Sequence, residues 1–407
     1  MIAWMAPSLE RVDFVYCPDI TAWPYYVLRS FNTPPWKGSF SDQLQPRLQL
    51  GQLRELSLSP VRLQDLQQLA EHTAFSEIRA LRLWGTIHDS SLEWLTESCS
   101  FPSLKKLALH AFDDRDDGRS WMNVTPEVKR SGAAFISSLP PLQSLQLSTD
   151  LGQETFEAVI YHHGSALRKL HFVSYRSSYD FVFTEDRVED ISMHCPQVED
   201  LAVPVPRTKG DAQEVGIYRS LGTFRRLKRL TLFFDRSITL TPYWAGSIIA
   251  PKARDLLMNA AIDEELARSI FRTITEAHPE VRCPLEWLRL EPGGDGLTRF
   301  NHRWLHNLLC NILRYLSGRF LCTRSPRDDA RDEVIVQEIG ARERQIIGEL
   351  APDSLGYFEE IFRDLWPEGT GDWRKDWRSI PLASEGSSGK EGSGWLSPQW
   401  YLACVVA

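Results

Sequence analysis

The stretch FRRLKRLTLFFD, residues 224 to 235, separates Leu227, Leu230 and Leu232 by charged and polar residues. Such alternation predicts a half-buried β-strand, because successive side chains of a strand point to opposite faces. The same L-x-x-L-x-L spacing recurs along the chain, so this stretch is one copy of a repeat. With apolar substitutions, its nine copies begin at Leu9, Leu53, Ile78, Leu104, Leu142, Leu167, Val198, Leu227 and Leu285.

The segments between the copies have the pattern of helices. Leu63, Leu66 and Leu69, for example, follow one another at helical spacing. A unit of one strand and one helix cannot bury its leucines alone, so stacked units must share a continuous core. The sequence therefore predicts an α/β solenoid, with a curved parallel sheet on the concave side and helices on the convex side. A doubly wound α/β domain is the alternative, but it does not require the same motif in every strand.

Three local signals mark helix ends. Thr125 is expected to cap a helix whose first residue is Pro126, where the missing N–H costs nothing. Ser90 and Glu93 have the spacing of a capping box. Gly164 is expected to end the helix that precedes it.

The repeat fades near residue 295. The stretch RWLHNLLCNILRYLSGRFL, residues 303–321, predicts an amphipathic helix, and DEVIVQEIG, residues 332–340, predicts a terminal strand. We expect the solenoid in residues 1–295, a C-terminal helical cap with an acidic, Trp-containing extension in residues 296–380, and a flexible linker and tail in residues 381–407.

Composition narrows the function classes. The chain has 407 residues, a net charge of -8 and a pI near 5.8, which does not favour nucleic-acid binding. Its seven cysteines are scattered and form no CxxC pair, which is typical of reduced thiols. The N-terminus shows no signal-peptide pattern, and no apolar run approaches the ~18 residues of a membrane span. We expect a cytoplasmic or nuclear protein.

The repeat resembles the leucine-rich-repeat superfamily, whose period is roughly 20–29 residues. The openings CSFPSLKKLAL (99–109) and HCPQVEDLAV (194–203) are closest to its F-box, ribonuclease-inhibitor-like branch, and the divergent Trp-rich copies look like fungal members. The resemblance covers roughly residues 8–295. It implies a non-enzymatic protein-interaction scaffold, because F-box proteins of this kind are substrate receptors of cullin-based ubiquitin ligases. No F-box is recognisable in this chain, so an F-box-less relative remains an alternative.

The concave face is the expected binding site for a protein partner, and a ligase adaptor is a further expected partner. Strand residues between the leucines point to this face, and they include cations and aromatics of the kinds enriched at protein hot spots. For any single residue, a solvated side chain without a function is the alternative. The expected partner-binding residues are Glu55, Arg82, Trp84, Lys106, His110, Gln146, Lys169, His171, Arg229, Phe233, Trp287 and Arg289.

Two patterns could hold a ligand other than a protein. His302, His306 and Cys310 follow one helical stripe at metal-ligand spacing, but a capping helix explains this pattern without a metal. Gly293 and Gly294 follow the last strand, where a tight turn explains them better than a phosphate loop. We therefore expect neither a metal nor a cofactor.

The remaining signals concern catalysis and the C-terminus. No nucleophile and base stand together, and His162 and His163 are expected to be exposed, so we do not expect an enzyme. The final CVVA fits the C-a-a-X prenylation rule at Cys404, and residues 384–394 form a Gly/Ser-rich linker. A membrane-tethered adaptor lipidated at Cys404 is therefore the alternative function.

Overall fold

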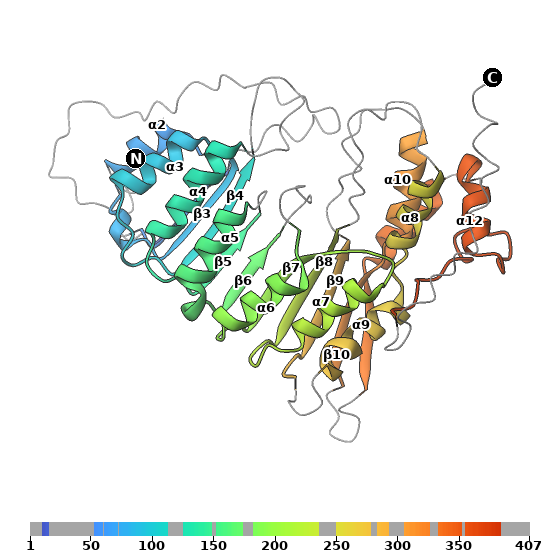
Figure 1. Cartoon of the computed structure of the whole chain (residues 1–407). Coiled ribbons are helices and arrows are strands. Elements are labelled where there is room, and N and C mark those ends of the chain that lie inside the picture. Colours follow the sequence, from blue (N-terminus) through green and yellow to red (C-terminus); the bar gives the residue numbers. More distant parts are fainter. Residues whose placement is uncertain are drawn as a thin grey trace.

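A computed structural model describes residues 10–15, 53–59, 61–71, 73–112, 125–148, 152–173, 182–235, 250–277, 283–292, 305–325, 333–351 and 355–383. In these residues, one eleven-stranded sheet has its strands in the order of the chain (Figure 1). The strands are β1 (Arg11–Val15), β2 (Glu55–Ser59), β3 (Ala80–Thr86), β4 (Lys106–Phe112), β5 (Ser144–Leu147), β6 (Lys169–Phe172), β7 (Asp200–Pro206), β8 (Arg229–Asp235), β9 (Trp287–Pro292), β10 (Arg319–Arg324) and β11 (Val334–Ile339).

The sheet is open and mostly parallel. Strands β1 to β9 pair in parallel, whereas β10 runs antiparallel to both β9 and β11. Each of the nine predicted repeat copies carries one of the parallel strands, so the predicted strands are confirmed. An α/β sheet in which every strand lies beside its neighbour in the chain is compatible with a repeat solenoid.

The repeat leucines hold the strands in register. Leu56 pairs with Leu81, and Leu230 pairs with Leu288, as the shared motif predicts. Leu230 and Leu288 are fully buried, as is Leu145 of β5. A slip of one residue would turn these leucines to the opposite face, so their burial fixes the alignment of the sheet.

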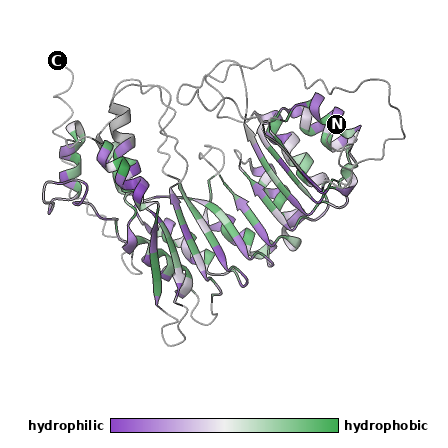
Figure 2. Ribbon diagram, turned by 180° about the vertical axis from the view of Figure 1, so that it is seen from behind, coloured by the Kyte–Doolittle hydropathy of each residue, from purple (hydrophilic) through white to green (hydrophobic). Residues whose placement is uncertain are grey.

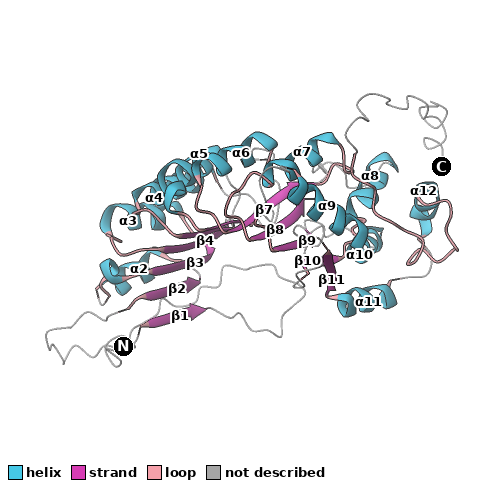
Figure 3. Cartoon of the chain, turned by 90° about the horizontal axis from the view of Figure 1, so that it is seen from below, coloured by secondary structure: helices cyan, strands magenta, loops and turns pink. Residues whose placement is uncertain are grey.

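Helices lie in a layer along one face of the sheet, and the strands follow an arc with this layer on its outer side (Figure 3). We call the opposite face of the sheet the concave face. The helices of this layer are α2 (Leu63–Ala70), α3 (Asp89–Ser98), α4 (Pro126–Ser138), α5 (Gln153–Glu157), α6 (Glu185–His194), α7 (Ala212–Leu221) and α9 (Glu264–Glu276). A second group, near the end of the sheet that β11 forms (Figure 3), contains α8 (Ala250–Ala260), α10 (Leu305–Leu316), α11 (Ala341–Leu350) and α12 (Glu359–Leu365).

The helix ends show which local signals are reliable. The Thr125 side chain accepts a hydrogen bond from the Val128 N–H at 3.3 Å, and Pro126 is the first residue of α4, which confirms that prediction. The predicted capping box of Ser90 and Glu93 is wrong. Helix α3 begins at Asp89 with His88 at the N-cap, two residues before the predicted cap, and the Asp89 carboxylate accepts from the Ser90 N–H at 2.8 Å.

Gly164 follows a π-helical turn, Ala158–His163, and opens a short 3-10 turn, Gly164–Ala166. Its φ of -49° is right-handed, so it does not end the helix in the left-handed conformation usual for glycine. Close packing explains the glycine instead, since a Cβ here would lie 2.6 Å from the His194 carbonyl oxygen.

Two apolar clusters stabilise the described chain. The larger one fills the space between the sheet and its helices. The smaller one joins α8, α10 and α12 with Trp373, so part of the Trp-containing segment contributes to a core. The predicted helix at residues 303–321 is confirmed only in part, because α10 ends at Leu316 and residues 319–321 begin strand β10. The predicted terminal strand is β11. The sheet itself continues past residue 295 through β10 and β11, and the predicted domain boundaries stay predictions.

Candidate functional site

The concave face carries all twelve predicted partner-binding residues, in strands β2 to β6, β8 and β9. Figure 2 shows the sheet from this side, with hydrophilic and hydrophobic residues both present along the strands. Eleven of the twelve are exposed or partly exposed, and only His110 is buried, with 7% of its surface exposed. The predicted set lies on seven strands, from Glu55 of β2 to Arg289 of β9, so it marks a broad surface and not one pocket.

Asp200 is the centre of the densest polar cluster on this face. It begins β7, and its backbone register places it between Lys169 of β6 and Arg229 of β8. Its carboxylate lies 3.6 Å from Lys169 Nζ and 3.2 Å from Arg229 Nη2, and it accepts a hydrogen bond from His171 Nε2 at 2.9 Å. Three of the predicted residues therefore converge on an acid that was not among them.

The electrostatics of this cluster favour an ionised Asp200. Burial alone would raise the pKa of its carboxyl group. The hydrogen bond from His171, together with the charges of His171, Lys169 and Arg229, outweighs burial and lowers the pKa below its usual value. The negative charge of Asp200 thus neutralises part of the positive charge around it.

A second pair of predicted residues forms an aromatic contact. The rings of Trp84 and His110 stack with centroids 5.1 Å apart, on neighbouring positions of β3 and β4. Burial lowers the pKa of His110 to about 4, so its ring is neutral at pH 7 and contributes an aromatic surface, not a charge. Phe233 of β8, which is partly exposed, adds apolar surface further along the sheet, whereas Pro204 at the equivalent position of β7 is buried.

Arg289 lies at the far end of the concave face and forms an ion pair with Glu291 of the same strand. Arg319 of β10 adds a second cation, with its Nε 3.4 Å from the other oxygen of Glu291. The carboxylate of Glu291 is therefore shared between two strands, and the charge of Arg289 is locally balanced.

A row of residues just before the strands was missed by the prediction. The residue preceding each strand from β2 to β8 donates its backbone N–H to the carbonyl of the equivalent residue in the preceding unit, over 2.7–2.9 Å. The row reads Arg54, Arg79, Lys105, Gln143, Arg168, Glu199 and Lys228. Its cationic character is visible in the motif, but only the sheet shows that these residues stand side by side.

Charge is divided between the two faces. Strands β2 to β8, each taken with the residue before it, contain nine Lys and Arg against four Asp and Glu. Helices α2 to α7 contain twelve Asp and Glu against four Lys and Arg. The sheet side is therefore positive within a chain whose net charge is -8.

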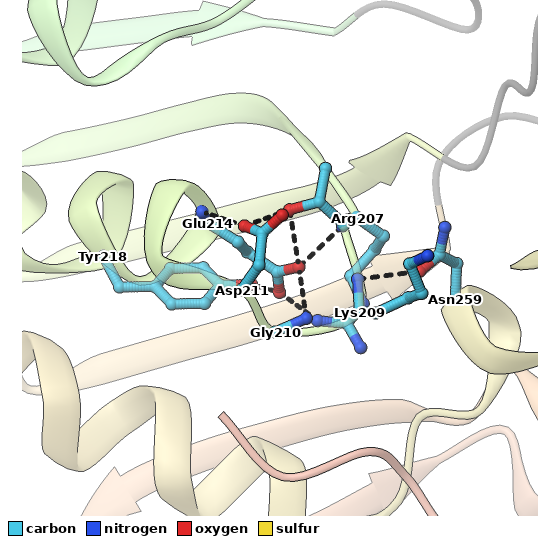
Figure 4. Close-up of polar contacts among 8 residues, drawn as sticks. Arg207, Lys209, Gly210, Asp211, Glu214, Tyr218 and Asn259 are labelled. Atoms are coloured by element: carbon cyan, nitrogen blue, oxygen red, sulfur yellow. Dashed lines mark hydrogen bonds and ion pairs between the residues drawn. The ribbon is translucent and has the colours of Figure 1, made fainter. Parts of the chain in front are cut away.

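A buried ionic cluster beyond the end of β7 is the strongest candidate for another kind of site (Figure 4). Glu214 of α7 accepts hydrogen bonds from Arg207 and, at 2.6 Å, from the Tyr218 hydroxyl. Its other oxygen accepts from the backbone N–H groups of Thr208 at 2.7 Å and Gly210 at 3.0 Å. The side chains of Arg207 and Glu214 are 0% exposed.

The environment of this cluster indicates a structural role. Burial, followed by the charge of Glu214, raises the pKa of Tyr218 well above its usual value. The Arg207 guanidinium also lies over the Phe234 ring, 5.5 Å from its centroid. Because a fully enclosed ion pair cannot contact a substrate, we interpret it as the anchor of the turn between β7 and α7, where Lys209 adopts a positive φ of 64°.

Cys99 and His162 line one shallow hollow beside the ends of α3 and α4. Burial raises the pKa of the Cys99 thiol to about 12, so the thiol is protonated at neutral pH. His162 Nε2 lies 3.1 Å from the Leu139 carbonyl oxygen. His162 is exposed as predicted, whereas the prediction for His163 is wrong, because this ring is fully buried under α4.

Several predicted features lie outside the described residues, namely Cys404, the 384–394 linker, Gly293, Gly294 and His302. The side chains of His306 and Cys310 in α10 are also not described. In the described part of the chain, no cluster of His, Cys, Asp and Glu could hold a metal ion. None of the described helices has the length and apolar character that crossing a bilayer demands.

Comparison with known proteins adds no family assignment, since no family model matches the chain and no curated protein is significantly similar to it.

Proposed function

We propose that the chain is a leucine-rich-repeat solenoid that acts as a non-enzymatic protein-interaction scaffold, with its partner on the concave face. The observation that carries the proposal is the division of the repeat strands between two faces. The repeat leucines are buried against the helices, while cations and aromatic residues occupy the opposite face of β3, β4, β6, β8 and β9. An exposed sheet with this composition has the residue types that protein interfaces favour.

The arrangement of these residues favours a protein partner. The partly exposed rings of Trp84 and Phe233 lie on one line across the strands, and charged groups such as Lys169 and Arg229 lie on another. A polypeptide lying across the strands would contact both lines, burying apolar surface against the first and pairing charges with the second.

The sequence resemblance extends the proposal to a biological role. We propose a substrate receptor of a cullin-based ubiquitin ligase, or a relative of such receptors without the F-box, in the cytoplasm or nucleus of a fungus. Affinity purification from cells tests this role directly. Recovery of a ligase adaptor and a cullin with the chain supports it, and their absence from repeated purifications contradicts it.

The concave face is tested by removing two of its aromatic rings, Trp84 and Phe233. We expect the double variant Trp84→Ala/Phe233→Ala to bind a purified partner at least about tenfold more weakly, because buried aromatic anchors typically contribute about 2 kcal/mol or more to binding. Isothermal titration calorimetry against the partner identified by affinity purification measures the change.

The matched control is Tyr161→Ala, which removes an aromatic ring that is 65% exposed on the helix side. It should leave the affinity unchanged. Circular dichroism of all variants checks that the fold persists. Equal affinities for the wild type and the folded double variant would contradict a partner site on this face.

A further inference from the structure

A group of cations on β3, β4 and β6 differs from the other charges on the sheet side. We name Arg79, Arg82, Lys105, Lys106 and Arg168 the cationic band. All five are exposed, and none forms an ion pair with a described residue. The band combines two predicted partner-binding residues, Arg82 and Lys106, with three from the row that precedes the strands.

Cations elsewhere in the same row have local partners. Arg54 Nη1 lies 3.3 Å from Glu10, and Lys228 Nζ lies 3.6 Å from Glu199. Each of these acids occupies the neighbouring position of the row, so the sheet geometry readily permits such pairing. In the cationic band, Arg79 and Lys105 have no acid at either neighbouring position of the row, and Glu199 beside Arg168 pairs with Lys228 instead.

Because no acidic residue separates them, positively charged residues of the band lie on neighbouring strands. The Lys105 N–H donates to the Arg79 carbonyl at 2.9 Å, which places the two residues on adjacent strands, about 5 Å apart. Lys106 follows directly in the chain. Like charges at neighbouring sheet positions repel one another and destabilise the pairing. An anionic partner would remove this repulsion on binding.

We infer that the cationic band binds an acidic polypeptide segment, one whose Asp and Glu side chains extend across the starts of β3 to β6. This inference rests on the proposed function and specifies the chemistry of the partner. The partly exposed rings of Trp84 and Phe233 lie on the same sheet, which suits a polypeptide. The acidic helices and the net charge of -8 oppose a long polyanion that would extend beyond the band.

Fluorescence anisotropy with a labelled peptide of about ten glutamates tests the inference, since an extended chain of this length exceeds the width of the band. We expect binding that weakens at least about tenfold as NaCl rises from about 50 to about 300 mM, because salt screens exposed charges. The variant Arg79→Gln/Lys105→Gln/Arg168→Gln should bind at least about tenfold more weakly than the wild type at low salt.

The matched control is Lys129→Gln/Arg130→Gln/Arg272→Gln, which removes the same amount of charge from helices α4 and α9. It should bind the peptide as the wild type does. Two results would overturn the inference: equal binding by the wild type and the band variant, or tighter binding of a single-stranded oligonucleotide of about ten bases at the same salt.

The two proposals can fail separately. If the band variant keeps its affinity for a purified partner that Trp84→Ala/Phe233→Ala has lost, the concave-face scaffold stands and the acidic-segment inference falls. If both variants retain full affinity, the proposed function itself is contradicted.

Discussion

The imidazole of His163 is fully buried and uses both of its nitrogens. Nδ1 accepts a hydrogen bond from the Leu142 N–H at 3.3 Å, and Nε2 donates to the Ile136 carbonyl at 2.9 Å. This pattern requires the neutral ring, because a protonated Nδ1 cannot accept. Burial is the main reason that the pKa of His163 is lowered. One residue thus links α4 to the start of β5.

Acidification should therefore destabilise the fold through its histidines. The folded pKa values of His163 and His110, the latter about 4, lie below the ordinary 6.5, so below pH ~6.5 the unfolded chain binds protons that the folded chain does not. Stability is full above this pH and falls as the pH drops. For His110 alone, we expect a loss of about 2 kcal/mol between about pH 7 and pH 5, measured by urea denaturation.

The variant His110→Gln isolates that contribution, and its stability should fall less over the same interval. Asp200 does not contribute to the change in stability between pH 7 and pH 5. Its lowered pKa gives stability that is present above the ordinary carboxyl value of 3.8 and is lost only in more acidic solution. A His110→Gln variant with the same pH dependence as the wild type would contradict this assignment.

Single residues of the candidate site were only partly predictable from sequence. Alternation with the leucines correctly assigned Lys169, His171 and Arg229 to one face, because side-chain direction in a strand is local. Their convergence on Asp200 depends on which strands are neighbours and in what register. The same applies to the row containing Arg79, which looks like a spacer between leucines until the units are stacked.

Among the elements, α7 and α9 pack so closely that one position between them must be glycine. A Cβ on Gly222 would lie 2.4 Å from the Ile274 carbonyl oxygen and 2.8 Å from the Ala277 Cβ. We expect Gly222→Ala to lower the free energy of unfolding by about 1–3 kcal/mol, as overpacked positions do. Chemical denaturation provides the measurement.

Gly132 is the matched control for this substitution. It lies inside α4, and nothing stands within 4 Å of the place its Cβ would take. Because alanine favours a helix interior over glycine, Gly132→Ala should raise stability by about 0.5–1 kcal/mol. The same chemical change should therefore have opposite signs at the two sites, and a stabilising Gly222→Ala would contradict the proposed steric limit.

The repeat predicted the nine parallel strands well, because each copy carries its own leucines. The 58-residue interval between the last two copies gave no clear helical pattern, so helices α8 and α9 were not predicted from the sequence. Asp263, which accepts from the Leu266 N–H at 2.9 Å, is an N-cap signal that could have located α9. Strand β10 follows a strong helical pattern without a break in hydrophobicity, so its antiparallel course was not predictable.

At the scale of the whole molecule, the division of charge predicts that the folded protein binds a negatively charged surface despite its negative net charge. The chain has a net charge of -8, yet its sheet side is positive. We expect the folded protein to be retained by a cation-exchange resin at about pH 7 and low salt, because a local potential, not the net charge, governs such contacts. Elution against a salt gradient measures the effect.

Unfolding provides the control, since the charges of the two faces mix in a disordered chain. In urea, which leaves charge unchanged, retention should disappear. The band variant Arg79→Gln/Lys105→Gln/Arg168→Gln should elute earlier than the wild type. If the folded wild type passed through the resin without retention, the positive potential of the sheet side would be too weak to outweigh the negative net charge.

The sequential order of the strands also has a consequence for folding. Each sheet pairing joins units that are neighbours in the chain, so pairing can start at several places and spread without closing a large loop. The hydrogen bonds from Ser379 to Asp263 and from Ala383 to Gly210 are exceptions, because they span more than a hundred residues. These two long-range contacts can form only after the sheet has brought their partners into place. The segment around Ser379 and Ala383 is therefore expected to dock last during folding and to detach first during unfolding.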